Sequence, residues 1–153
     1  MWKIFSSLLL VLVLTSISLA ETFQFGFDEV RFTVERPENW DKKEKNNGVQ
    51  LTSDDKKTSI AISVNEKKNV SIEDIQQVLP SKLGLTEVKK QERKRLIVIS
   101  GILEGQPIQI QLYNRDDCLL SIVTAGEDKE KIKACIASLR QVSLTPISDS
   151  ESK

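Results

Sequence analysis

The clearest strand pattern of this chain lies in the segment RLIVISGILEGQPIQIQLYNRDDCLLSIVT, residues 95–124. Its apolar-rich runs are separated by polar turns, with runs at 95–103, 107–113 and 118–124 and turns at 104–106 and 114–117. Runs of this length, rich in β-branched residues and joined by turns that contain Gly, Asn and Asp, are typical of antiparallel strands. Together with the polar, strand-like residues 86–92 before it, the segment predicts a β-meander.

A helix is expected before the meander, beginning after Ser71. Ser71 can cap the first turn, and Asp74 stands three residues on as its capping-box partner. One helical face is apolar, formed by Ile72, Ile75, Val78 and Leu79. Pro80 should bend or end this helix, and Gly84 allows the chain to turn out of it.

Closer to the N-terminus, residues 29–35 alternate apolar and polar side chains and predict a half-buried strand. Trp40 follows the turn after this strand and should anchor it on the core. Residues 42–47 read as a charged loop. Residues 49–52 and 58–64 then predict a hairpin around a polar turn at 53–57.

The chain should end in a second helix at 127–141, because apolar residues recur there at helical spacing. Consecutive hairpins with one helix in the middle and one at the end predict the α+β class, an antiparallel β-sheet meander covered by two main helices. The expected organisation is a single domain at 21–142, followed by a disordered polar tail at 143–153.

Residues 1–20 have the pattern of a signal peptide. Lys3 precedes an apolar run at 8–14, and small residues at 18 and 20 fit the positions that signal peptidase requires. The sequence therefore predicts cleavage after Ala20 and export to the periplasm or the medium. No later segment is apolar and long enough to predict a membrane span.

The motif Arg36-Pro37-Glu38-Asn39-Trp40 after a strand, and Ala137-Ser138-Leu139 in the closing helix, resemble the PsbP-like superfamily. This superfamily includes the photosystem extrinsic subunit and exported bacterial proteins of the DcrB type. The resemblance spans about residues 23–142 and implies a helix-covered α/β/α sandwich. It also implies binding or assembly of other proteins, with no common catalytic site.

Composition argues against several chemistries. The chain has 22 basic and 22 acidic residues and no histidine. A balanced charge is unlike the strongly basic face that nucleic-acid binding requires. Without histidine, the usual general base and the commonest ligand of zinc, copper or iron are missing. Since no phosphate loop, dinucleotide fingerprint or Cys-x-x-Cys pair is present either, we expect no enzyme, no cofactor and no metal.

Two further features each have two interpretations. Cys118 and Cys135 are the only cysteines, and they predict either a disulfide or two buried free thiols. The basic run at 89–95 either contacts an acidic partner or protects a solvated edge strand from aggregation. Its candidate partner-binding residues are Lys89, Lys90, Arg93, Lys94 and Arg95.

Two acidic pairs, Asp54-Asp55 and Asp116-Asp117, lie in predicted hairpin turns. If the fold brought the two pairs together, their carboxylates could bind Ca²⁺ or act as the acid and base of a glycosidase. Asp is also favoured in turns, because its side chain accepts hydrogen bonds from nearby backbone amides. We favour the turn role.

The leading hypothesis is an exported, non-catalytic module of the cell envelope that binds or assembles another protein. The alternative is a carrier of a small ligand, or a weak carboxylate-based enzyme, with a pocket between sheet and helix. A pocket with converging polar groups would favour the alternative, and a flat apolar surface the leading hypothesis.

Overall fold

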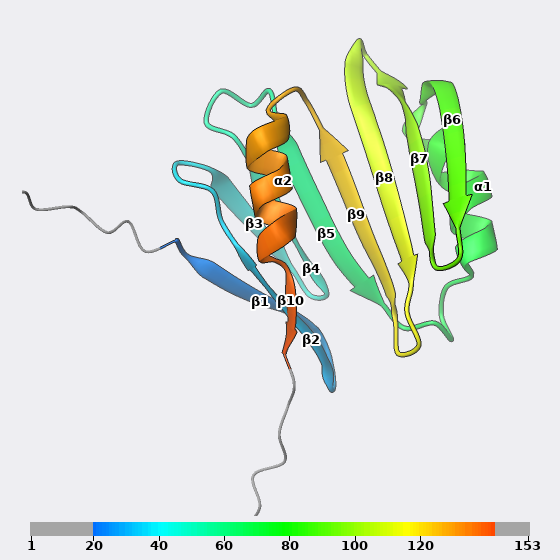
Figure 1. Ribbon diagram of the computed structural model, residues 1–153, viewed down its shortest axis with the longest axis horizontal. Coiled ribbons are helices and arrows are strands. Elements are labelled where there is room, and N and C mark those ends of the chain that lie inside the picture. Colours follow the sequence, from blue (N-terminus) through cyan, green and yellow to red (C-terminus); the bar gives the residue numbers. More distant parts are fainter. Residues whose placement is uncertain (1–19, 143–153) are drawn as a thin grey trace, which may run out of the picture.

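The computed structural model describes residues 20–142 of the chain and is mainly β-structure (Figure 1). Strands hold 52% of these residues and helices 18%. Ten strands form two antiparallel sheets, and there are two short helices among the described residues. The predicted α+β fold, a sheet covered by two main helices, is therefore wrong. The predicted signal peptide up to residue 19 and the predicted tail at 143–153 lie outside the described residues.

The smaller sheet has the strand order β1-β2-β10, with bounds β1 Thr22–Phe27, β2 Val30–Glu35 and β10 Arg140–Val142. Successive side chains of a strand point to opposite faces of the sheet, so every second residue can enter the core. The buried residues are Phe23 and Phe25 of β1 and Phe32 and Val34 of β2. The strand predicted at 29–35 is confirmed as β2, whereas β1 and β10 were not predicted. The smaller sheet packs on the face of the larger sheet that a helix was expected to cover.

The larger sheet has seven strands in the order β3-β4-β5-β9-β8-β7-β6. Their bounds are β3 Asp41–Lys45, β4 Gly48–Thr52, β5 Ser59–Asn65, β6 Thr86–Arg93, β7 Leu96–Leu103, β8 Gln106–Asn114 and β9 Leu119–Ala125. The predicted hairpin and the predicted meander are confirmed as β4-β5 and β6-β9. The predicted loop at 42–47 is wrong, because β3 occupies most of it. All five residues of β3 are exposed, so no apolar alternation marked the strand.

The front face of the larger sheet, defined here as the face toward the smaller sheet, carries the first core. Side chains of β4, β5 and β9 pack there against β1 and β2. Trp40, which is only 1% exposed, joins this core from the turn between β2 and β3, which confirms its predicted anchoring role. The backbone N–H of Trp40 donates to the Pro37 carbonyl at 3.2 Å and closes the turn.

The back face carries the second core, under helix α1 (Ile72–Leu83). Ile72, Ile75 and Leu79 of α1 pack on alternate residues of β7 and β8. The Ser71 side chain accepts from the Asp74 backbone N–H, and Gly84 ends the helix at φ 72°, as predicted. Pro80 does not end the helix, which continues for three residues beyond it.

Helix α2 (Lys129–Ser138) lies on the front side, beside the smaller sheet (Figure 1). Asp128 caps it by accepting from the Lys131 backbone N–H at 3.1 Å. The helix is shorter than the predicted 127–141, because Leu139 is extended and the chain then pairs with β2 as β10. No helix among the described residues is long and apolar enough to span a membrane.

Candidate functional site

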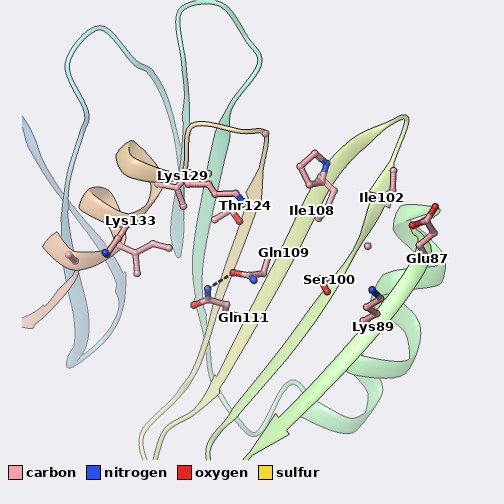
Figure 2. Close-up of a pocket in the computed structure, with 16 residues that line it drawn as sticks. Glu87, Lys89, Ser100, Ile102, Ile108, Gln109, Gln111, Thr124, Lys129 and Lys133 are labelled. Atoms are coloured by element: carbon pink, nitrogen blue, oxygen red, sulfur yellow. Dashed lines mark hydrogen bonds between the residues drawn. The ribbon is translucent and has the colours of Figure 1, made fainter.

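A groove runs between α2 and the part of the front face that neither α2 nor the smaller sheet covers (Figure 2). We call it the helix–sheet groove. Its volume is approximately 840 Å³, and it is lined from β6, β7, β8, β9 and α2. The main polar lining residues are Lys89, Ser100, Gln109, Gln111, Thr124, Lys129 and Lys133.

The polar floor of the helix–sheet groove follows from the alternation of β8. Ile108, Ile110 and Leu112 are buried in the back core. The residues between them, Gln109 and Gln111, therefore lie on the front face and line the groove. A sheet with one apolar face and one polar face normally exposes the polar face to solvent. The floor is thus an open sheet surface, and α2 forms one wall over it.

Hydrogen bonds along β8 orient the amide groups of this floor, and Figure 2 shows the one between Gln111 and Gln109. The Tyr113 hydroxyl donates to Gln111 Oε1 at 2.8 Å, and Gln111 Nε2 donates to Gln109 Oε1 at 2.8 Å. Burial raises the pKa of Tyr113 above its ordinary value, so this phenol keeps the proton it donates. Because the Gln109 oxygen is already an acceptor, its amide NH₂ points away from Gln111 and is available as a donor in the groove.

Three lysines bring positive charge to the helix–sheet groove. Lys129 and Lys133 are one turn apart on α2, and Lys89 stands on β6 across the floor (Figure 2). None of the three forms an ion pair with another described residue, whereas neighbouring Lys90 and Lys131 do. Glu87 of β6 is the acidic residue in the lining. The described lining therefore has an excess of positive charge.

Apolar side chains complete the lining. Ile132 and Ile136 of α2 are half-buried, pack on the front core and also face the groove. Ile102 of β7 and Pro107 of β8 lie at the opposite rim. The helix–sheet groove thus combines apolar walls, a hydrogen-bonding floor and a cationic rim.

The basic run at 89–95 does not form one surface. Lys89 lines the helix–sheet groove, but Lys90 pairs with Glu92 at 3.4 Å on the opposite face of the sheet, and Arg95 pairs with Asp116 at 3.1 Å beyond the strand. Arg93 ends β6, and Lys94 lies in the turn after it. β6 is the edge strand of the larger sheet and is exposed along its length. This placement agrees with the edge interpretation, and partner binding by these residues stays a prediction.

Cys118 and Cys135 are free thiols, so the structure shows no disulfide between them. Both are buried in the front core. Cys118 precedes β9, which extends away from it for seven residues before the chain reverses into α2. A strand advances about 3.3 Å per residue and a helix only about 1.5 Å, so α2 does not return far enough to bring Cys135 beside Cys118.

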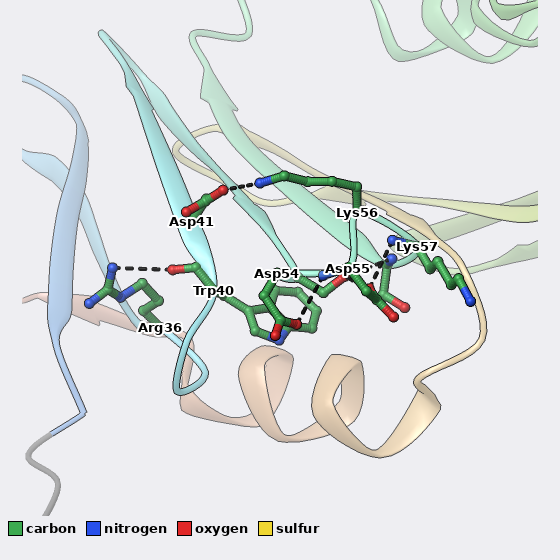
Figure 3. Close-up of polar contacts among 9 residues, drawn as sticks. Arg36, Trp40, Asp41, Asp54, Asp55, Lys56 and Lys57 are labelled. Atoms are coloured by element: carbon green, nitrogen blue, oxygen red, sulfur yellow. Dashed lines mark hydrogen bonds and ion pairs between the residues drawn. The ribbon is translucent and has the colours of Figure 1, made fainter.

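Asp54 and Asp55 behave as turn residues, whereas Asp116 pairs with Arg95 and Asp117 accepts from Gln141 Nε2. Asp55 accepts from Ser53 Oγ at 2.6 Å and from the Lys57 backbone N–H at 3.0 Å (Figure 3). These hydrogen bonds, that of Ser53 foremost, lower the pKa of Asp55. Asp116 and Asp117 lie just before the first residue of β9. The turn at 53–57, which holds Asp54 and Asp55, lies beside the last residue of that strand. A length of about 20 Å thus separates the pairs. No group of acidic or cysteine side chains among the described residues is arranged to hold a metal ion.

The residues of the helix–sheet groove were not candidates in the sequence analysis, apart from Lys89. Their signals were the alternating amides of Pro107-Ile-Gln-Ile-Gln-Leu112 and two lysines four residues apart on a helix. Each pattern alone is common. Only the sheet topology shows that they face each other.

No family model matches the chain, and no curated protein matches it. Among solved structures, it is similar to a protein from Bacteroides thetaiotaomicron with 12% sequence identity and a TM-score of 0.48. The alignment covers 80% of this chain and 48% of that protein, so this chain spans about half of its length. The resemblance to the PsbP-like superfamily stays a prediction.

Proposed function

We propose that this chain is an exported, non-catalytic binding protein that carries a small ligand in the helix–sheet groove. The observation that supports this proposal is the convergence of polar side chains from separate elements on one hollow. Small-molecule sites typically occupy about 300–1,000 Å³ and combine an apolar lining with a few placed polar groups. The groove, at approximately 840 Å³, has this size and this composition.

The export and non-catalytic parts of the proposal rest on the sequence. The pattern of residues 1–20 supports export, and the absence of histidine from the chain argues against general-base chemistry near neutral pH. Lysines and one glutamate are the ionisable side chains in the described lining. Charge attraction and hydrogen bonding are the interactions that these residues can offer a ligand.

Docking of a partner protein through the basic run has less support. Its five candidate residues are divided between the groove face of β6, the opposite face of the sheet and the turn after β6. Charged residues along an edge strand also oppose the addition of another strand.

Photo-crosslinking from α2 tests the proposal with a matched control. Ala137 and Ala134 are both exposed on the same helix, but Ala137 lines the helix–sheet groove and Ala134 lines a hollow beside β2. Each would be replaced by benzoylphenylalanine, and the purified proteins irradiated with an extract of the cells that make them. We expect a small-molecule adduct at position 137 and none at 134 by intact mass spectrometry.

Two outcomes would count against a ligand groove. Equal labelling at positions 137 and 134 would indicate nonspecific capture. A protein-sized adduct at 137, without a small one, would favour the docking hypothesis.

A further inference from the structure

Accepting the proposed function, we infer that the ligand of the helix–sheet groove is an anionic amphiphile, a molecule with one carboxylate or phosphate head group on a hydrocarbon chain. The head group lies between the α2 lysines and Gln109, and the chain lies along the apolar walls. The inference depends on three properties of the groove: its donors, its charge and its apolar surface.

The hydrogen bonds of β8 make the floor a donor to the ligand. Tyr113 donates to Gln111 and Gln111 donates to Gln109, which occupies one lone pair of each amide oxygen. The Gln109 NH₂ group is then left to donate in the direction of the groove (Figure 2). An ionised carboxylate or phosphate oxygen is an acceptor only, and hydrogen bonds to such groups are shorter and stronger than bonds between neutral groups.

The charge of the rim favours the same head group. Lys129 and Lys133 lie on the wall beside the floor, and neither has an ion-pair partner among the described residues. An i,i+4 pair of lysines on one helix face is mutually repulsive. An anion held between the two ammonium groups would relieve that repulsion.

The apolar surface requires the second part of the ligand. Ile132 and Ile136 line the same helix wall as the lysines, and Ile102 and Pro107 line the far rim. A purely polar anion would leave these side chains in water. A hydrocarbon chain would remove their surface from water, at roughly 25 cal/mol for each Å² of apolar surface that it buries.

Titration calorimetry with single-chain probes below their micelle concentrations tests this ligand class. The probes are dodecanoate and dodecyl phosphate, with 1-dodecanol as the neutral control, acetate as the head group without a chain, and dodecyltrimethylammonium as the cationic control. The two anionic probes distinguish carboxylate from phosphate. We expect saturable 1:1 binding of at least one of them, at least tenfold weaker binding of dodecanol, and no saturable binding of acetate.

Variants connect the binding to the named residues. Lys133→Met keeps the alkyl stem and removes the charge, so dodecanoate should bind about two- to fivefold more weakly. Gln109→Glu replaces the donor with a carboxylate and should weaken binding about tenfold or more. Lys43→Met, on the exposed edge strand β3, is the matched control and should leave the affinity unchanged. All three side chains are exposed, and circular dichroism verifies that the variants fold.

The ligand class is wrong if dodecanol or dodecyltrimethylammonium binds as tightly as the anions, or if Lys43→Met weakens binding as much as Lys133→Met. The crosslinking experiment separates this failure from failure of the proposed function. A small-molecule adduct at position 137 without dodecanoate or dodecyl phosphate binding would reject the amphiphile and keep the ligand groove. Absence of both results would reject both proposals.

Discussion

The two cysteine thiols should be nearly inert while the protein is folded. Burial is the main cause that raises the pKa of Cys118 from 9.0 to about 12 and that of Cys135 from 9.0 to about 11. The Cys135 thiol also donates to the Glu35 carbonyl at 3.6 Å. Because the thiolate is the nucleophile, these values reduce the reactive fraction at pH 8 by about 1,000-fold at Cys118 and about 100-fold at Cys135.

Alkylation with iodoacetamide at pH 8, followed by peptide mass spectrometry, measures this protection. We expect both cysteines to react far more slowly in the folded protein than a free thiol, and both to react at the rate of a free thiol in guanidinium chloride. Fast labelling of either cysteine in the folded protein would refute the assigned burial. A protein mass lower by two hydrogens, with no thiol to label after unfolding, would show the disulfide that the structure lacks.

The same pKa shifts give stability a defined pH dependence. A thiol whose pKa is raised by folding contributes stability that is fully present below its unfolded pKa and lost as pH rises through its folded pKa. The contribution of the cysteines should therefore decline from about pH 9 to about pH 11–12. Cys135→Ala removes one of the two thiols. The free energy of unfolding, measured in urea, should therefore fall less between about pH 9 and about pH 11 in this variant than in the unsubstituted protein.

Three substitutions test the fold itself by urea or guanidinium unfolding. Trp40→Ala should lower the free energy of unfolding by about 3–5 kcal/mol, because the indole is 1% exposed in the front core; a loss below about 1 kcal/mol would contradict that burial. Ser71→Ala should cost about 1 kcal/mol through loss of the α1 cap, and Ser71→Thr should retain most of the cap. Gly126→Ala should cost more than about 1 kcal/mol, since φ is 100° and the new Cβ would clash with the Lys57 carbonyl oxygen; an unchanged midpoint would show that the turn before α2 adjusts freely.

Local patterns predicted most of the elements of the larger sheet. The meander, the hairpin before it and helix α1 have apolar periodicity, turn residues and caps that agree with one another. Such agreement between local signals makes a segment predictable from its sequence. β3 is the exception, because a fully exposed edge strand has no buried side chains to mark it.

The assembly of the sheets was not predictable in this way. The alternation of Phe23, Phe25 and Phe27 is a signal for β1, but this short stretch directly follows the predicted signal peptide and was not predicted as a strand. β10 has three residues and pairs with β2 more than a hundred residues earlier, a partner that no local pattern identifies. Once both strands are placed, the smaller sheet rather than a helix covers much of the front core, which explains why the predicted fold class was wrong.

The candidate site depended on the same long-range information. Gln109 and Gln111 are unremarkable polar residues of a strand until topology leaves their part of the front face uncovered. The lysines of α2 belong to the site because that helix follows β9 and stands beside this surface. The predicted cysteine and acidic candidates, by contrast, have structural surroundings that explain them without a ligand.

A chemical-shift map of the ¹⁵N-labelled protein titrated with dodecanoate tests the ligand groove most directly. We expect the largest amide shifts from residues that line the helix–sheet groove, including Ser100, Gln109, Lys129 and Lys133, and hardly any shift from residues of α1 and β3. Shifts centred on α1, or spread evenly over both faces of the larger sheet, would contradict this expectation.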